Sequence, residues 1–138
     1  MSTTTLYAVG HGAGSFDWRV VETALAQGFL PQTISSDLHI YNVAGPVYDL
    51  VTTVSKFLYL GLSLDDAIAK VTAVPAQVMG MADAIGTLRV GAWGDAVVLA
   101  LEEGAFALTD SAGVTRTGRQ MLSPHAVIRQ GRLYTQRS

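Results

Sequence analysis

The feature that most constrains this chain is a pair of short runs, the first of them apolar, with one helical pattern between them. The first run covers residues 6–10, and the second covers residues 33–36. Residues 16–27 place apolar side chains at the spacing of an amphipathic helix, which Ser15 or Asp17 can cap. A strand, a helix and a strand in this order are typical of a parallel α/β architecture.

Three further helices are expected downstream. Residues 49–60 again carry apolar side chains at helical spacing. Ser63, followed three residues later by an acidic residue, resembles a capping box in front of a helix over residues 64–72. Pro75 suits the first turn of another short helix that ends near Gly80.

Beyond residue 86 the composition and the spacing change to those of strands. Small and β-branched residues dominate, glycines recur, and Gln130 and Gly131 form a turn between two apolar segments. Strands are expected at residues 95–101, 106–109, 127–128 and 132–135, with a turn at residues 110–113. The sequence therefore predicts an α/β part over residues 1–85 and an all-β part over residues 86–138.

Composition excludes several classes of protein. Nine Lys and Arg against eleven Asp and Glu give a formal net charge of -2, which leaves no basic excess for a nucleic-acid partner. The chain contains no cysteine, so disulfides, cysteine zinc sites and thiol nucleophiles are excluded. Neither a signal peptide nor an apolar run of the roughly 20 residues that span a bilayer is present, so we expect a cytoplasmic protein without a membrane partner.

Two polar residues follow the predicted parallel strands directly, at the edge where such folds place function. His11 follows the first strand and Asp37 follows the second. A histidine offers a nitrogen ligand or an acid–base group, and an aspartate offers a carboxylate for a metal or for proton transfer. Gly12 would let the backbone approach a ligand closely, and His39 lies in the loop after Asp37, where it could touch a substrate.

The alternatives to these roles stay open at this point. His11 can be a turn residue, Asp37 can be a cap, and His39 can be a solvated loop residue. Lys56 and Lys70 lie on predicted helices and are expected to be solvated charges.

Three other catalytic patterns fail on the residues. The Gly-His-Gly segment is similar to an oxyanion-hole loop of lipases, but no GxSxG nucleophile motif occurs. The glycine spacing also fails the dinucleotide-binding fingerprint. With only three histidines and no HxH or HExxH pair, one chain alone is not expected to complete a zinc site.

An ordered series of motifs resembles the C-terminal part of the amidohydrolase superfamily, in particular its dihydroorotase-like deacetylases. The motifs are VGHGAGSFDW, ALAQGFLPQTISSDLHIYN, GPVYDLVTTVSKFLYLGLS, VTAVPAQVMGM and GTLRVGAWGDAVVL. The resemblance implies a metal-dependent (β/α)8-barrel hydrolase with a small β-sandwich. Such enzymes cleave cyclic amides or N-acyl C–N bonds.

The resemblance also implies roles for individual residues. Asp37 matches the aspartate that closes the last barrel strand, where it binds a divalent metal, expected to be zinc, and acts as general base. His11 would face the active site, and we assign His11, Gly12 and His39 to substrate binding. The sequence departs from the family pattern at Gly94, which replaces the usual small residue before Asp95, and at Val74, which replaces asparagine in the TAVPA segment. The second departure is expected to affect a helix cap rather than chemistry.

The family's HxH pair, bridging lysine and two further metal-binding histidines have no counterpart in this sequence. A TIM barrel takes about 250 residues, so this chain has room for two strands and their helices. The predicted fold class is therefore α/β: the last two strands and helices of a barrel, followed by part of a β-sandwich. We expect a chain that is inactive alone and acts on a small-molecule amide once the remaining barrel segment completes it. A non-catalytic remnant or assembly module that self-associates is the alternative.

Overall fold

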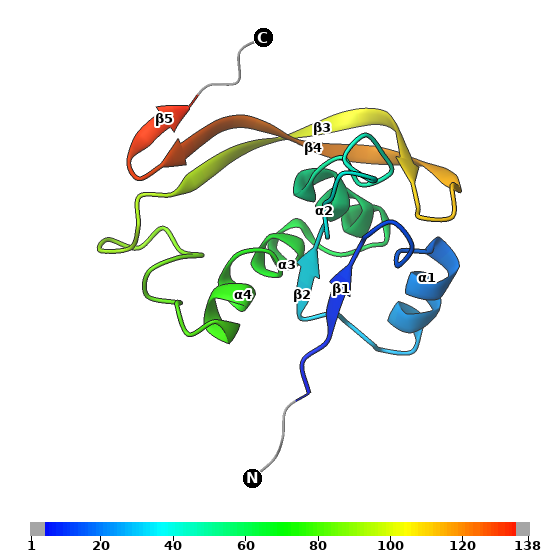
Figure 1. The fold of residues 1–138 in the computed structure, drawn as a ribbon, viewed down its shortest axis with the longest axis horizontal. Helices are drawn as coiled ribbons and strands as arrows, with labels where there is room; N and C mark the ends of the chain where they lie inside the picture. The colour runs from blue at the N-terminus through cyan, green and yellow to red at the C-terminus, as the bar shows by residue number, and fades with distance from the viewer. Residues whose placement is uncertain (1–4, 135–138) are drawn as a thin grey trace.

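The computed structural model describes residues 5–134, which form two separate sheets and four helices (Figure 1). In chain order the elements are β1 (Ala8–Gly10), α1 (Trp18–Ala26), β2 (Thr33–Ser35), α2 (Leu50–Tyr59), α3 (Leu64–Ala69), α4 (Ala73–Val78), β3 (Ala96–Thr109), β4 (Thr115–Arg129) and β5 (Arg132–Tyr134). In Figure 1 the long β3–β4 hairpin arches over α2, and β1 and β2 lie below α2.

The predicted strand–helix–strand unit is confirmed. Strands β1 and β2 pair in parallel, with Val9 opposite Ile34. Asp17 is the N-cap of α1, and its carboxylate accepts hydrogen bonds from the backbone N–H groups of Arg19 and Val20. A side-chain oxygen at this position satisfies donors that the first turn of a helix leaves free, so the helix begins where the sequence predicts.

The next two helices are also confirmed, and Ser63 caps the second of them as predicted. Asp49 accepts a hydrogen bond from the backbone of Thr52, and Ser63 accepts one from the backbone of Asp66. Helix α3 ends at Ala69, before the predicted end at residue 72, because Thr72 is already the N-cap position of α4.

The second sheet differs most from the prediction. Strand β3 is continuous over residues predicted as two strands, with a register shift between Glu103 and Phe106. Strand β4 runs over 15 residues, of which the sequence predicted only the last few. Polar residues, Gly118 and Pro124 interrupt the apolar alternation of β4, so its pairing with β3 decides its structure.

The predicted terminal hairpin is confirmed over its described residues. Gln130 and Gly131, both at positive φ, connect β4 to β5, and Arg129 pairs with Arg132. Positive φ at both central residues is typical of the tight turns that fit the twist of two strands. The last predicted residue of this hairpin, Thr135, lies outside the described residues.

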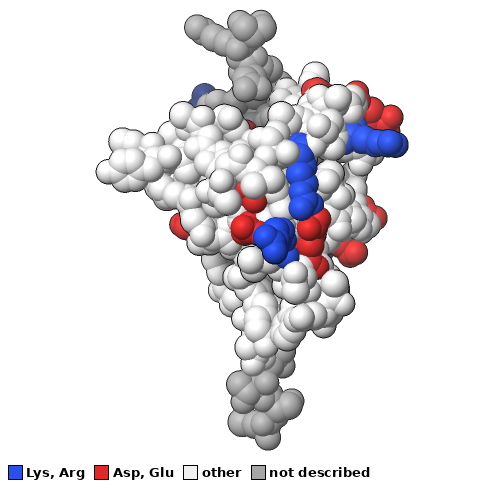
Figure 2. Space-filling model, turned by 90° about the vertical axis from the view of Figure 1, so that its right-hand side faces the viewer, with Lys and Arg blue, Asp and Glu red and all other residues white. Residues whose placement is uncertain are grey.

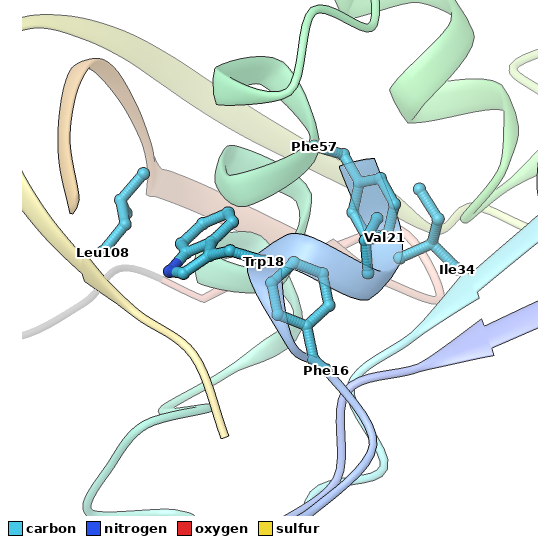
Figure 3. Close-up of a cluster of buried hydrophobic side chains, with 6 residues drawn as sticks. All are labelled: Phe16, Trp18, Val21, Ile34, Phe57 and Leu108. Carbon is cyan, nitrogen blue, oxygen red and sulfur yellow. The ribbon is translucent and has the colours of Figure 1, made fainter. Parts of the chain in front are cut away.

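The main hydrophobic core joins the two parts of the chain (Figure 3). It consists of buried side chains from the α1 region, β2, α2 and β3: Phe16, Trp18, Val21, Ile34, Phe57 and Leu108. Leu108 of β3 lies at the edge of this cluster, beside the Trp18 ring in Figure 3. The α/β part and the β part therefore share buried contacts, and a domain boundary near residue 85 stays a prediction.

Much of the face shown in Figure 2 is uncharged, and many large hydrophobic side chains are exposed. In the view of Figure 2, a few basic and acidic side chains lie side by side, and uncharged residues cover most of the face. Large hydrophobic side chains are exposed in several loops, including Ile40 and Tyr41 after β2 and Leu88 and Val90 before β3. Among residues 5–134, no helix has the length and hydropathy needed to cross a membrane.

Candidate active site

The candidate site lies where the carboxyl ends of β1 and β2 meet. The backbone N–H of His11 donates to the carbonyl of Ser35 at 3.0 Å, and that of Gly12 donates to the carbonyl of Ser36 at 3.1 Å. These bonds continue the parallel pairing beyond the strands. They bring Gly12 next to Asp37, as expected for residues that follow neighbouring parallel strands.

Gly12 makes room for the Asp37 carboxylate. A Cβ atom at position 12 would lie 2.9 Å from Oδ2 of Asp37, and the φ angle of Gly12 is +54°. Both observations require glycine, because a side chain would meet the carboxylate and strain the backbone. The close approach that the glycine-rich segment predicted is thus an approach to Asp37.

Asp37 is an exposed residue on a loop with fixed geometry. Its φ angle is 50°, a left-handed conformation that aspartate and asparagine tolerate better than most residues. Its backbone carbonyl accepts a hydrogen bond of 3.0 Å from the amide of Asn42, which is fully buried. The same Asn42 accepts a bond from the backbone N–H of His39 through its side-chain oxygen at 2.8 Å. Asn42 therefore holds the Asp37 loop (residues 37–42) from inside.

His39 is exposed on this same loop. Its Nδ1 accepts a hydrogen bond of 3.2 Å from the backbone N–H of Tyr41, and the two rings lie edge to face at 5.9 Å between centroids. The ring thus stands two residues from Asp37, on the surface. Contact of His39 with a substrate stays a prediction.

His11 lies beneath the loops and is fully buried. Its Nδ1 is 2.9 Å from the carbonyl oxygen of Gly12, its Nε2 is 2.6 Å from Nζ of Lys56, and its ring stacks on Phe16 with centroids 4.7 Å apart. Burial lowers the pKa of His11, because a charged imidazole would lose its hydration, and the Lys56 charge lowers the pKa further. Both ring nitrogens are therefore engaged within the chain, and contact of His11 with a substrate stays a prediction.

Lys56 is not the solvated charge that the sequence predicted. It is fully buried in α2, and its ammonium donates to His11, to the carbonyl of Pro46 at 2.8 Å and to the carbonyl of Thr109 at 2.5 Å. Burial lowers the pKa of Lys56 to about 8, and the charge of Asp110 opposes this shift. Helix α2 carries no other charged residue. A helix without a charged face is typically buried, so this pattern could have indicated that Lys56 is buried.

Asp110, in the turn between β3 and β4, is a second buried charge near this lysine. Its carboxylate accepts hydrogen bonds from the backbone N–H groups of Ala112 and Val114 within the turn and of Trp18 at 3.2 Å. Ser111 extends the connection, because it exchanges hydrogen bonds with the backbone of Phe16. The turn of the β part therefore holds the segment that follows His11.

The described residues do not fit a complete metal centre. Among residues 5–134, no group of three or more His, Cys, Asp or Glu side chains is placed to hold a metal ion. Asp37 is an accessible carboxylate, whereas the nitrogens of His11 already have partners. A zinc site takes three or four protein ligands, so this chain supplies at most part of one.

Comparisons with known proteins identify the family that this chain resembles. The model of the "Amidohydrolase family" matches residues 21–134. A deacetylase of Enterococcus faecalis is 37% identical over 130 residues, which cover 94% of this chain and 35% of the relative. A deacetylase of Agrobacterium fabrum is 40% identical over 121 residues, which cover 87% of this chain and 30% of the relative.

Two solved structures share the fold at similar sequence identity. A structure described as an adenine deaminase superposes with a TM-score of 0.90 at 36% identity and covers 96% of this chain and 36% of that chain. A structure described as a dihydroorotase superposes with a TM-score of 0.85 at 33% identity and covers 94% of this chain and 35% of that chain.

These similarities extend over nearly all of this chain. The chain in turn spans about a third of the length of the relatives that it matches. The family match, the deacetylase relatives and the α/β fold shared with both enzyme structures lead to one assignment: the chain belongs to the amidohydrolase family.

Proposed function

We propose that this chain forms the C-terminal part of a metal-dependent amidohydrolase that cleaves a cyclic amide or an N-acyl C–N bond. The observation that carries the proposal is the exposed carboxylate of Asp37 at the carboxyl end of β2, beside Gly12, in a chain with deacetylase relatives. Parallel α/β folds place catalytic side chains at this edge. We also propose a cytoplasmic location, because the chain contains no cysteine.

Asp37 is proposed as the catalytic base and as one ligand of a divalent metal, expected to be zinc. In hydrolysis of an amide, the oxygen of a water molecule bonds to the carbonyl carbon and the C–N bond breaks. The carboxylate takes the proton of the water and delivers it to the leaving nitrogen. Because the left-handed backbone at Asp37 is fixed by Asn42, the carboxylate is held ready for this transfer.

Gly12 and His39 are proposed to line the substrate side of the site. Gly12 leaves open space over the Asp37 carboxylate, and the exposed ring of His39 lies on the same loop. A small amide placed against the carboxylate would meet the backbone of Gly12, and His39 is proposed to contact it from the same loop. His11 is proposed to be part of the same site and lies buried beneath it, next to Gly12.

The barrel that this activity needs is proposed to include strands outside this chain. Strands β1 and β2 pair only with each other among the described residues, so each has an unpaired edge. Such edges and the apolar side chains near them favour pairing with further strands. The remaining metal ligands would come from those strands, either in the same polypeptide or in a partner chain.

A complementation experiment tests this proposal. The purified chain is mixed with the separately produced first two thirds of the Enterococcus faecalis deacetylase, with Zn²⁺, and hydrolysis of a panel of N-acetyl compounds and cyclic amides is measured. We expect association and turnover only in the mixture, loss of turnover with Asp37→Asn, and normal turnover with Asp65→Asn, an exposed control in α3. Association without turnover contradicts the proposed hydrolase, and equal activity of both variants contradicts the role of Asp37.

A second function, a non-catalytic assembly module, is favoured by the exposed apolar surface. Ile40 is 81% exposed, Tyr41 86% and Leu88 85%. Apolar side chains in such positions favour self-association when no partner covers them. Sedimentation of the purified chain distinguishes the two functions: oligomers that persist when the complementing segment is added support the module, and dissociation into a one-to-one complex supports the enzyme.

A further inference from the structure

A single buried ammonium connects three segments that meet below the candidate site. Nζ of Lys56 lies 2.6 Å from the His11 ring after β1, 2.8 Å from the carbonyl of Pro46 before α2, and 2.5 Å from the carbonyl of Thr109 at the end of β3. An ammonium has three hydrogens to donate, and here each has an acceptor. The lysine is therefore fully satisfied within the chain.

This arrangement determines which hydrogen the His11 ring carries. Because an ammonium is only a donor, Nε2 of His11 must accept its hydrogen bond and carries no hydrogen itself. Nδ1 then carries the ring hydrogen and donates it to the carbonyl of Gly12, 2.9 Å away. His11 is thus neutral, in one tautomer, with both nitrogens in use.

The His11 ring in turn fixes the residue that faces Asp37. Two hydrogen bonds hold Gly12. Its N–H donates to the carbonyl of Ser36, and its carbonyl accepts a hydrogen bond from Nδ1 of His11. Its Cα lies against the Asp37 carboxylate, as the 2.9 Å contact of an added Cβ shows. Phe16 stacks on the imidazole, and the centroid of its ring lies 5.7 Å from Nζ of Lys56, so Phe16 packs against both members of this contact.

We propose that Lys56 is a positioning residue of the candidate site: it holds His11 as the neutral Nδ1–H tautomer and, through His11, sets Gly12 against Asp37. In this arrangement His11 is neither a metal ligand nor the general base. The catalytic meaning of this inference rests on the proposed function, whereas the geometry itself belongs to the chain and is measured without any reaction.

Nuclear magnetic resonance of the histidine rings in the full chain tests the inference. Correlations between ring carbon-bound hydrogens and the two nitrogens identify the tautomer of His11, with His39→Gln and His125→Gln assigning the other two rings. We expect a protonated Nδ1 and an unprotonated Nε2 in His11. A single Nε2–H tautomer in the unmodified chain overturns the proposal, and this measurement requires no variant to fold.

Two lysine variants and one metal sharpen the test. In Lys56→Met we expect loss of the single tautomer and shifts of the Gly12 and Asp37 amide signals, whereas Lys70→Met, the other lysine of the chain, leaves all of them in place. Unchanged His11 signals in a folded Lys56→Met variant overturn the proposal. Addition of Zn²⁺ alone to the unmodified chain should leave Nε2 of His11 unshifted, and a zinc-induced shift of Nε2 would show a metal ligand and overturn it. Failed complementation with the expected tautomer refutes only the proposed function.

Discussion

Two groups of polar residues lie at the same end of the β1–β2 pair and differ in where their partners are. The buried polar cluster (His11, Lys56 and Asp110) is enclosed, and its side chains bond to groups of the chain itself. The Asp37 loop is tied down by its backbone, while the Asp37 and His39 side chains are exposed. The two groups therefore have different roles. Buried polar groups whose hydrogen bonds are made within the chain hold the geometry, and polar side chains at the surface are available for chemistry.

Substitution of the buried lysine should produce the largest loss of stability. Lys56→Met leaves the acceptors on His11, Pro46 and Thr109 without a donor. Each buried unsatisfied group costs about 1–3 kcal/mol, and relief of the ammonium's desolvation offsets part of this, so we expect a net loss of about 3 kcal/mol. Urea unfolding followed by tryptophan fluorescence measures it. Lys70→Met is the matched control, and an equal loss of stability in both variants would contradict the stabilising role of Lys56.

Stability should also change with pH through the same lysine. The pKa of Lys56 is lowered from 10.5 to about 8 in the folded chain. Between pH 8 and pH 10.5 the unfolded chain holds a proton that the folded chain has released. The free energy of unfolding therefore rises with pH across this range, and the gain is lost again as pH falls from 10.5 through 8. The expected gain is on the order of 2–3 kcal/mol. Urea unfolding across this range gives the slope in the unmodified chain and in Lys56→Met, and parallel slopes would contradict burial of the ammonium.

A smaller loss is expected where the two groups meet, at Gly12. In Gly12→Ala the new Cβ strains a backbone with φ of +54° and meets Oδ2 of Asp37 at 2.9 Å. The left-handed conformation alone costs about 1–2 kcal/mol for a residue with a side chain. Gly14→Ala is the control, since nothing lies within 4 Å of its added Cβ. Thermal unfolding of the two variants measures the difference, and similar midpoints would show that the glycine at position 12 is not required.

The smallest effect on stability is expected at the exposed carboxylate. Asp37→Asn keeps the shape of the side chain, and asparagine tolerates the positive φ of this position. We expect a change within about 0.5 kcal/mol in unfolding, as for most surface substitutions. In the complemented enzyme the same variant should lose turnover. A large loss of stability would place Asp37 among the residues that hold the fold.

Sequence patterns predicted the parts of the fold that depend on near neighbours. The β1–α1–β2 unit and the caps Asp17 and Ser63 rest on local spacing and side-chain chemistry, and the structure confirms them. Strand β4 depends on pairing with β3 across Gly118 and Pro124, so its local pattern was too weak to identify it.

The candidate site divides in the same way. The place of Asp37 after a strand follows from one short segment of sequence. The burial of Lys56 depends on acceptors 10, 45 and 53 residues away, and these meet only in the folded chain. Its position in an otherwise uncharged helix was the available hint.

The turn between β3 and β4 has a consequence for the order of folding. Asp110 and Ser111 bond to the backbone of Trp18 and Phe16, across 92 and 95 residues of chain. Contacts between residues so far apart in sequence close late, because the entropy of ordering the intervening chain has to be overcome first. The segment that carries the candidate site therefore reaches its final conformation only once the β3–β4 turn has formed.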